Sequence, residues 1–92
     1  MPVDERDINK GIEVLKKNGA QRAWLFGSAL EAPQIARDID FACEGIPSRR
    51  FFEVVGELLD ALEKPVDLVD VDVNNRLTRY IRSKGRLLYD AR

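Results

Sequence analysis

Two aspartates, Asp38 and Asp40, are the residues whose type and spacing most clearly suggest chemistry. They open residues 38–43, a stretch that alternates polar and apolar side chains and therefore predicts a β-strand. Side chains two residues apart project from the same face of a strand, so the two carboxylates would lie together. Aspartate is depleted in strands and like charges repel, which favours a site for a hard divalent cation such as Mg²⁺. Solvated aspartates on a half-exposed strand are the alternative.

Asp67 supplies a third carboxylate, inside the short apolar run 66–69. A single acid in such a strand is disfavoured unless it faces a site or solvent. Asp70 and Asp72 are alternatives for the same role. Strand alternation places Asp70 on the face opposite Asp67, and both alternatives lie near the start of a predicted helix, where acids stabilise the N-terminus. We therefore expect Asp67 to belong to the site and the other two acids to be structural.

Gly27 and Ser28 directly follow the apolar run 23–26. Glycine lets a ligand approach the backbone closely, and amide groups together with a serine hydroxyl can form a small concavity that binds anions. Taken alone, the pair is more typical of a turn that ends a strand, with the serine as a cap.

The composition is that of a folded domain, and it excludes several kinds of site. Hydrophobic residues make up 45% and charged residues 34% of the 92 residues, so we expect one domain over residues 1–92. The net charge of −1 argues against binding nucleic acid by bulk charge. Because the chain has no histidine, histidine general bases, Ser-His-Asp triads and histidine-type zinc sites are excluded. The single cysteine, Cys43, and the absence of a long apolar run indicate a cytoplasmic protein without a membrane partner.

Hydrophobic periodicity predicts the elements that must position these side chains. Helical spacing predicts three helices, with Gly19 as a left-handed cap after the first and Ser48 as the N-cap of the second. Short apolar or alternating runs predict four strands. The expected order is helix, strand, strand, helix, strand, helix, strand, at residues 4–18, 23–26, 38–43, 48–63, 66–69, 76–83 and 87–89. The loop at 27–37 has room for one helical turn at its start.

These elements are expected to form an α/β (α+β) fold, with one small mixed sheet of about four strands and helices packed against it. A helical connection favours some parallel pairing, whereas the strands that flank the loop at 27–37 could pair in either sense. On the second helix, the predicted apolar face consists of Phe51, Val55, Leu58 and Leu62, widened by Phe52 and Leu59. Base rates favour core positions for Phe51, Phe52, Val54 and Val55.

Taken together, the order and spacing of these motifs resemble the nucleotidyltransferase superfamily that includes DNA polymerase beta. Gly27-Ser28 ends one strand, Asp38-Ile39-Asp40 opens the next after nine intervening residues, and Asp67 lies on a later strand. The short length and the closing stretch at 85–90 look most like the minimal nucleotidyltransferase (MNT) proteins. The resemblance extends from Gly27 to Tyr89 and implies the nucleotidyltransferase fold.

The resemblance implies roles for five residues. Gly27 and Ser28 would bind the nucleotide phosphates, while Asp38, Asp40 and Asp67 would bind metal and carry catalysis. In this family two Mg²⁺ ions activate the attacking hydroxyl and stabilise charge on the α-phosphate and the leaving pyrophosphate. The implied reaction transfers a nucleoside monophosphate, with ATP as the expected donor of AMP. Asp67 would be either a metal ligand or the base for the acceptor hydroxyl.

The resemblance also implies a protein partner. MNT proteins of this kind are similar to the antitoxins of all-helical HEPN ribonucleases in prokaryotes, where they are thought to transfer AMP to a toxin tyrosine or otherwise to block the toxin. With 92 residues the chain has no room for a separate recognition domain, so another chain would present the acceptor. One alternative keeps the fold but neutralises the partner by stoichiometric binding. Another discards the resemblance and leaves a small domain of unknown role with an acidic site. The number of subunits stays open, a homo-oligomer included.

Two positions depart from the MNT pattern. Members usually carry a small residue and then Arg-Gly shortly after Gly-Ser, and Glu31 stands about where that arginine is expected. This exchange could weaken nucleotide binding without abolishing metal binding. A serine usually precedes the Asp-x-Asp motif, where this chain has Arg37. Arg37 either restores the missing positive charge at the nucleotide or is a surface residue.

Basic residues gather around the last predicted helix, namely Arg76, Arg79, Arg82, Lys84 and Arg86. Such a run is most often a solvated helix face. The alternatives are contact with an acidic partner or with a nucleic-acid acceptor, of which nucleic acid is not favoured.

Overall fold

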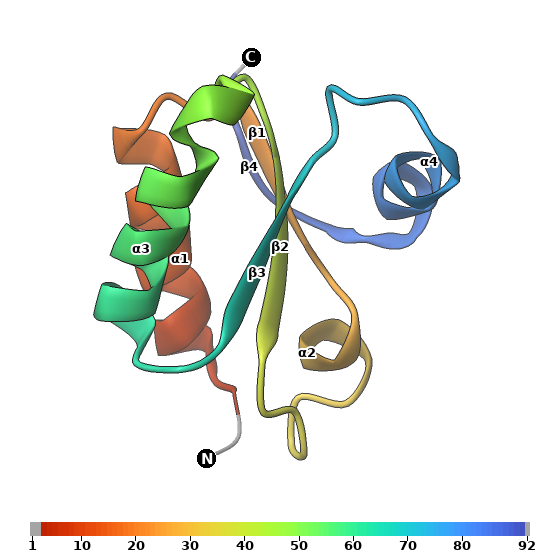
Figure 1. The fold of residues 1–92 in the computed structure, drawn as a ribbon. Coiled ribbons are helices and arrows are strands. Elements are labelled where there is room, and N and C mark those ends of the chain that lie inside the picture. The colour runs from red at the N-terminus through yellow and green to blue at the C-terminus, as the bar shows by residue number, and fades with distance from the viewer. Residues whose placement is uncertain (1–2, 92) are drawn as a thin grey trace.

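The computed structural model describes residues 3–91 of the chain, and Figure 1 shows how its elements are arranged. In chain order they are α1 (Glu5–Lys17), β1 (Arg22–Phe26), α2 (Ser28–Glu31), β2 (Ile39–Glu44), η1 (Ser48–Arg50), α3 (Phe51–Leu62), β3 (Val66–Asp70), α4 (Arg76–Lys84) and β4 (Arg86–Asp90). The predicted order is confirmed. The short helix α2 is the helical turn for which the loop after Gly27 has room.

The four strands form one mixed sheet in the order β3-β2-β1-β4. β1 pairs antiparallel with both β2 and β4, whereas β2 and β3 pair in parallel. The connection through α2 therefore turns the chain back on itself, while the longer connection through α3 carries it over to a parallel neighbour, as parallel pairing requires. The prediction of a small mixed sheet with packed helices is confirmed.

Helices α1 and α3 cover one face of the sheet and form the main core with it (Figure 1). α1 begins with a capping box in which the Asp4 carboxylate accepts from the backbone N–H groups of Arg6 and Asp7. Just past its end, Gly19 has a φ of 95°, as predicted for a left-handed cap. The alternating side chains Ile39 and Phe41 of β2 are fully buried on this face, which confirms the predicted alternation of that strand.

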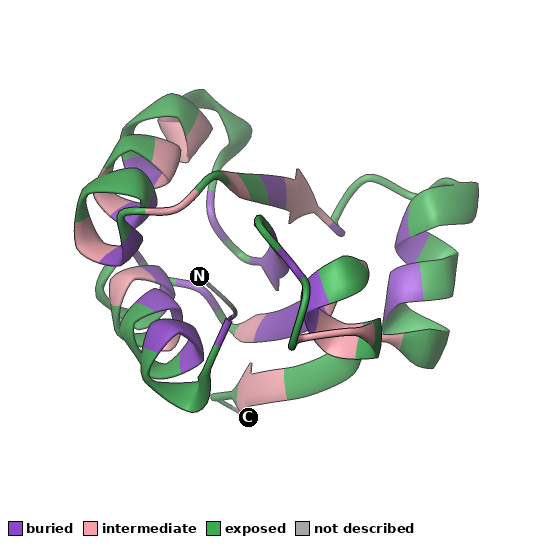
Figure 2. Ribbon diagram, turned by 90° about the horizontal axis from the view of Figure 1, so that it is seen from below, coloured by how far each residue is buried: buried purple, intermediate pink, exposed green. Residues whose placement is uncertain are grey.

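Helix α4 lies on the other face of the sheet, where only a small apolar cluster forms. The buried members of this cluster are Trp24, Ala42, Val71 and Ile81. Figure 2 shows buried segments along the sides of α1 and α3 that face the sheet, whereas most of α4 is exposed. On this second face Trp24 and Ala42 are buried, whereas Asp40 is half-buried and Asp67 is exposed near the start of β3.

The start of α3 differs from the prediction. Ser48 does not cap an α-helix; it begins the 3₁₀ turn η1, and α3 starts at Phe51 without a side-chain cap. Phe52 is 94% exposed, so its predicted core position is wrong, and Leu59 is exposed as well. The buried stripe of the helix is Val54, Leu58 and Leu62, with Phe51 and Val55 only partly buried beside it. Because each residue turns the helix by 100°, Phe52 points away from this stripe. Packing against α1 and the sheet buries the stripe of Val54, Leu58 and Leu62, and not the neighbouring stripe that was predicted.

Within residues 3–91, no helix is both long enough and apolar enough to span a membrane.

Candidate functional site

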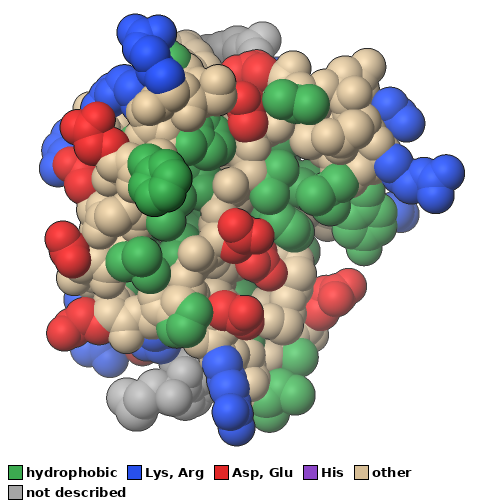
Figure 3. All heavy atoms as spheres, in the orientation of Figure 1, with side chains coloured by type: hydrophobic (Ala, Val, Ile, Leu, Met, Phe, Trp, Pro, Cys, Tyr) green, Lys and Arg blue, Asp and Glu red, His purple; other side chains and the backbone are tan. Residues whose placement is uncertain are grey.

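Asp40 and Asp67 lie side by side on neighbouring strands. They are direct partners in the parallel register of β2 and β3. Partners in a sheet project to the same side, and this side is the open face that α4 covers only in part. The topology therefore brings together two acids that are 27 positions apart in the sequence. Figure 3, which looks onto the edge strand β3, shows acidic side chains gathered in the middle of the view, between hydrophobic groups on the α3 and α4 sides.

The charges of Asp38 and Asp67 both act on Asp40. Burial raises the pKa of Asp40, and the negative charges of Asp38 and Asp67 raise it further. Asp40 is half-buried, whereas Asp38, directly before β2, and Asp67, near the start of β3, are exposed. An acidic cluster of this kind gains from a cation that offsets its repulsion.

Gly27 brings the end of β1 against this cluster. It has a φ of 73°, and a Cβ atom at this position would overlap the Oδ2 atom of Asp40. Only glycine combines this backbone conformation with so close an approach. Ser28 follows as the exposed first residue of α2. The turn predicted to hold phosphates therefore adjoins the acids predicted to hold metal.

The donor set suits Mg²⁺ in chemistry, because all three side chains offer hard carboxylate oxygens. Their arrangement is incomplete. The Oδ1 atom of Asp67 accepts from the backbone N–H of Leu68 at 3.0 Å, so this carboxylate lies along its own strand. Among residues 3–91, no three acidic, cysteine or histidine side chains are close enough to hold a metal ion.

Arg37 is an exposed residue that lines a surface pocket. That pocket, of about 500 Å³, is bordered by Arg37, Glu63, Lys64 and Pro65. Neither Gly27 nor Ser28 contributes to its lining. The predicted role of Arg37 in binding nucleotide stays a prediction.

Asp70 and Asp72 stabilise the turn after β3. Asp72 accepts from the backbone N–H of Gly45 at 3.0 Å, and Asp70 accepts from the backbone N–H of Asp72 at 2.9 Å. These are structural bonds, although they hold a turn and do not stabilise the N-terminus of α4. That end is capped by Asn75, which accepts from the N–H of Thr78.

The predicted basic face around α4 is smaller than the sequence suggests. Arg82 pairs with the buried carboxylate of Glu44 at 3.0 Å, and its guanidinium lies 5.4 Å from the centre of the Trp24 ring. Arg86 forms a two-pronged ion pair with Glu5. These two arginines hold the fold together, which reduces the charge left for an acidic partner or nucleic acid.

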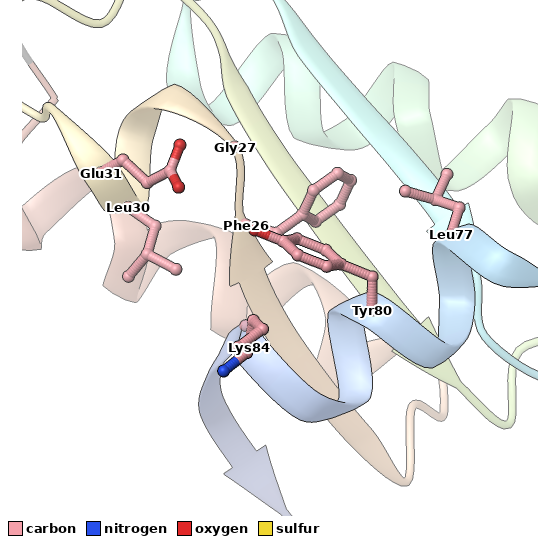
Figure 4. Close-up of a pocket in the computed structure, with 8 residues that line it drawn as sticks. Phe26, Gly27, Leu30, Glu31, Leu77, Tyr80 and Lys84 are labelled. Carbon is pink, nitrogen blue, oxygen red and sulfur yellow. The ribbon is translucent and has the colours of Figure 1, made fainter.

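A cleft of about 320 Å³ lies between the β1–α2 turn and α4. Phe26, Gly27 and Glu31 line it from one side, and Leu77 and Tyr80 line it from the other (Figure 4). No functional role was predicted for Phe26, Leu77 or Tyr80. The spacing of Leu77, Tyr80 and Lys84 could have indicated this wall of the cleft. It places the three residues on one side of α4, and the buried residues of that helix are Thr78 and Ile81.

Comparison with solved structures shows a similar fold in toxin–antitoxin complexes. A crystal structure of the toxin-antitoxin MntA-HepT matches with a TM-score of 0.74 and 26% identity, over 95% of this chain and 73% of that chain. A toxin-antitoxin structure with AMP-PNP matches with a TM-score of 0.76 and 29% identity, over 89% and 72%. A complex of tri-AMPylated Shewanella oneidensis HEPN toxin with MNT antitoxin matches with a TM-score of 0.74 and 27% identity, over 94% and 71%.

No curated protein sequence shows significant similarity to the chain. The family model described as "Polymerase beta, Nucleotidyltransferase" matches residues 9–92, which is nearly the whole sequence. The resemblance drawn from the Gly-Ser and Asp-x-Asp motifs is thereby confirmed, and the chain belongs to the polymerase beta nucleotidyltransferase family.

Proposed function

We propose that the chain is a Mg²⁺-dependent nucleotidyltransferase that transfers AMP from ATP to a hydroxyl group of a helical HEPN-type toxin, and so acts as its antitoxin. The observation that carries this proposal is the register of the β2–β3 pair, in which Asp40 lies directly beside Asp67. Asp38 and the Gly27 turn adjoin the same acids. The groups that we propose to bind phosphate and metal thus adjoin each other at one end of the sheet.

In the reaction we propose, the hydroxyl oxygen of the acceptor attacks the α-phosphorus of ATP. The bond from the α-phosphorus to the bridging oxygen breaks, pyrophosphate leaves, and the hydroxyl proton passes to a carboxylate or to water. Bound Mg²⁺ would supply positive charge to the α-phosphate and the leaving pyrophosphate. Asp38 and Asp40 would hold it, with Asp67 as a third ligand or as the base that takes the proton.

The Gly27 turn would hold the phosphates. Its positive φ and missing side chain leave the backbone accessible, and the Ser28 hydroxyl is exposed beside it. Arg37, two residues before β2, would add positive charge as the triphosphate binds. Positioning and charge would supply most of the catalysis, as expected for phosphoryl chemistry without a histidine.

The partner follows from the relatives. The MntA-HepT structure and the structure of the MNT antitoxin with its tri-AMPylated HEPN toxin are both complexes. Each contains a protein that folds like this chain. AMP on the toxin of the second complex is the product that the proposed reaction would make. We therefore propose a HEPN-type toxin as both partner and acceptor.

Transfer of label tests this function. The purified chain, MgCl₂ and ATP labelled at the α-phosphate are added to a lysate of the organism that encodes it. We expect one labelled protein, identified by mass spectrometry as a helical HEPN-type chain. ATP labelled at the γ-phosphate should give no additional labelled protein when the chain is added, since pyrophosphate leaves. An Asp38→Asn/Asp40→Asn variant should be inactive, whereas Asp60→Asn, which changes an exposed acid of α3, should remain active. Equal labelling by both variants would refute the proposal.

A second function is supported by Glu31. This acid is exposed on α2, where MNT proteins usually carry an arginine, and it lines the cleft beside Gly27. A chain that binds ATP poorly could still neutralise a toxin by covering it. Asp40→Asn separates the two functions, because it should abolish transfer and leave association intact. A toxin that the variant still neutralises fully would favour the binding module.

A further inference from the structure

One stripe of α4 faces a cleft and takes no part in the core. Leu77, Tyr80 and Lys84 recur at intervals of three and four residues, so they share one side of the helix. Leu77 is 48% exposed and Tyr80 is 52% exposed. The side chain of Tyr80 extends from α4 toward the end of β1 at Phe26 and Gly27 (Figure 4). The stripe therefore forms one wall of an open site.

This wall is held in place by contacts elsewhere on α4. Ile81 is buried in the small cluster with Trp24, and Arg82 reaches the carboxylate of Glu44. At the end of the helix, a Cβ atom on Gly85 would lie 2.6 Å from the carbonyl oxygen of Ile81 and 3.2 Å from that of Leu25. Such close approach fixes α4 against β1, so the cleft exists before any ligand binds.

The cleft combines aromatic surface with one side chain of each charge. Phe26 and Tyr80 supply the rings, and Glu31 and Lys84 supply the charges. Its volume of about 320 Å³ lies at the lower end of the range for small-molecule sites. A flat heterocycle with a sugar attached matches this size and this mixture of surfaces.

Gly27 joins the cleft to the proposed reaction site. It lines the cleft, and the carboxylate of Asp40 packs against it on the acidic side. A nucleotide whose phosphates lie at this turn would therefore reach the cleft with its other end.

We propose that this cleft binds the nucleoside part of the donor nucleotide, with the base stacked on Tyr80 and Glu31 accepting a hydrogen bond from the sugar or the base. The inference rests on the proposed function and adds the residues that recognise the donor. An acid at position 31 would repel a phosphate, but hydroxyl and amine groups of a nucleoside are donors that a carboxylate accepts. The unexpected Glu31 thus matches the end of the nucleotide that carries no charge.

Binding measurements by isothermal titration calorimetry test the inference without relying on turnover. Two probes are used in the presence of Mg²⁺: ATP, and inorganic tripolyphosphate, which lacks the nucleoside. Tyr80→Ala should raise the Kd for ATP roughly 5- to 150-fold, the loss expected for one stacked base, and leave the Kd for tripolyphosphate within about twofold. Tyr80→Phe should restore most of the ATP affinity. Arg79→Ala, which changes the neighbouring exposed residue outside the cleft, should alter neither Kd.

Glu31→Ala should affect the two probes differently. It should weaken the binding of ATP, whereas tripolyphosphate should bind as tightly as before or more tightly. Unchanged ATP affinity in Tyr80→Ala, or equal loss for both probes, would overturn the inference and leave the cleft to a protein partner or to no ligand. The proposed function would survive that result as long as the acids are needed for AMP transfer. An unmodified chain that binds neither probe and transfers no label would overturn both.

Discussion

The two faces of the sheet differ in how completely they are covered. On one face, α1 and α3 bury a continuous core that includes Leu15, Phe41 and Leu58 without exposure. On the other face, α4 and the short α2 leave the ends of β2 and β3 open, and the acids and the cleft lie there. The first face supplies stability, and the second keeps charged groups near one another at a cost in stability.

This difference predicts where substitutions should act. Buried side chains on the covered face should affect folding and not binding. Exposed side chains of the acidic end and of the cleft on the open face should do the reverse.

Two leucines on opposite faces form the strongest test. Leu58→Ala removes a fully buried side chain of α3 and should lower the free energy of unfolding by about 2–5 kcal/mol. Leu77→Ala removes a half-exposed side chain of α4 and should change it by less than about 0.5 kcal/mol. Urea denaturation measures both. Similar losses for the two variants would mean that the open face carries core packing.

Asp40→Asn should separate activity from stability. Loss of a carboxylate that we propose to hold metal should lower AMP transfer at least about 100-fold, the range for groups that stabilise developing charge. The pKa of Asp40 is raised by burial and by its acidic neighbours, so the ionised form disfavours folding. That destabilisation is present above the raised pKa and disappears as the pH falls below the ordinary value of 3.8.

The variant should therefore be as stable as the unmodified chain at pH 7 or more stable, by less than about 1 kcal/mol, because solvent screens the acids. The difference should shrink as the pH is lowered toward 3. Thermal denaturation across this range gives the measurement, with Asp60→Asn as the control. A variant that is inactive because it unfolds would contradict the division between the two faces.

A pair of glycines should respond with opposite signs. Gly27→Ala places a Cβ atom against Asp40 at a positive φ and should cost about 1–2 kcal/mol, besides displacing that carboxylate. Gly56→Ala adds a methyl group in open space on α3 and should stabilise the chain by roughly 0.5–1 kcal/mol. Chemical denaturation compares them. Stabilisation by both would show that the turn at Gly27 does not need glycine.

Cys43 should be inert while the covered face stays closed. Burial, followed by the charges of Asp70 and Asp72, raises the pKa of its thiol to about 12. At pH 8 the folded chain should not react with a disulfide reagent, and the thiol should react once urea unfolds the chain. Above pH 9 the unfolded thiol ionises and the folded one does not, so stability should fall as the pH rises toward 12. Rapid reaction of the folded chain at pH 8 would show that this face opens easily.

Local pattern was enough to predict much of the fold. The alternation from Asp38 to Cys43 placed Ile39 and Phe41 in the core and the acids on the other side, because the two-residue period of a strand is a property of the backbone. The helical spacing in α1 and the cap at Gly19 were predicted for the same reason, as was the order of the elements. The family resemblance could also be drawn from the sequence, because it rests on the order and spacing of the Gly-Ser and Asp-x-Asp motifs along the chain.

Contacts between distant segments decided the rest. That Asp40 lies beside Asp67 depends on the parallel register set by the crossover through α3, and no local pattern specifies this register. The exposure of Phe52 depends on which of two overlapping stripes packs on α1. Tyr80 lines the same cleft as Phe26 and Glu31 only because α4 packs beside the end of β1. Periodicity is encoded within a few residues, whereas register, choice of face and clefts arise from the packing free energy of the whole chain, and so only the tertiary structure determined them.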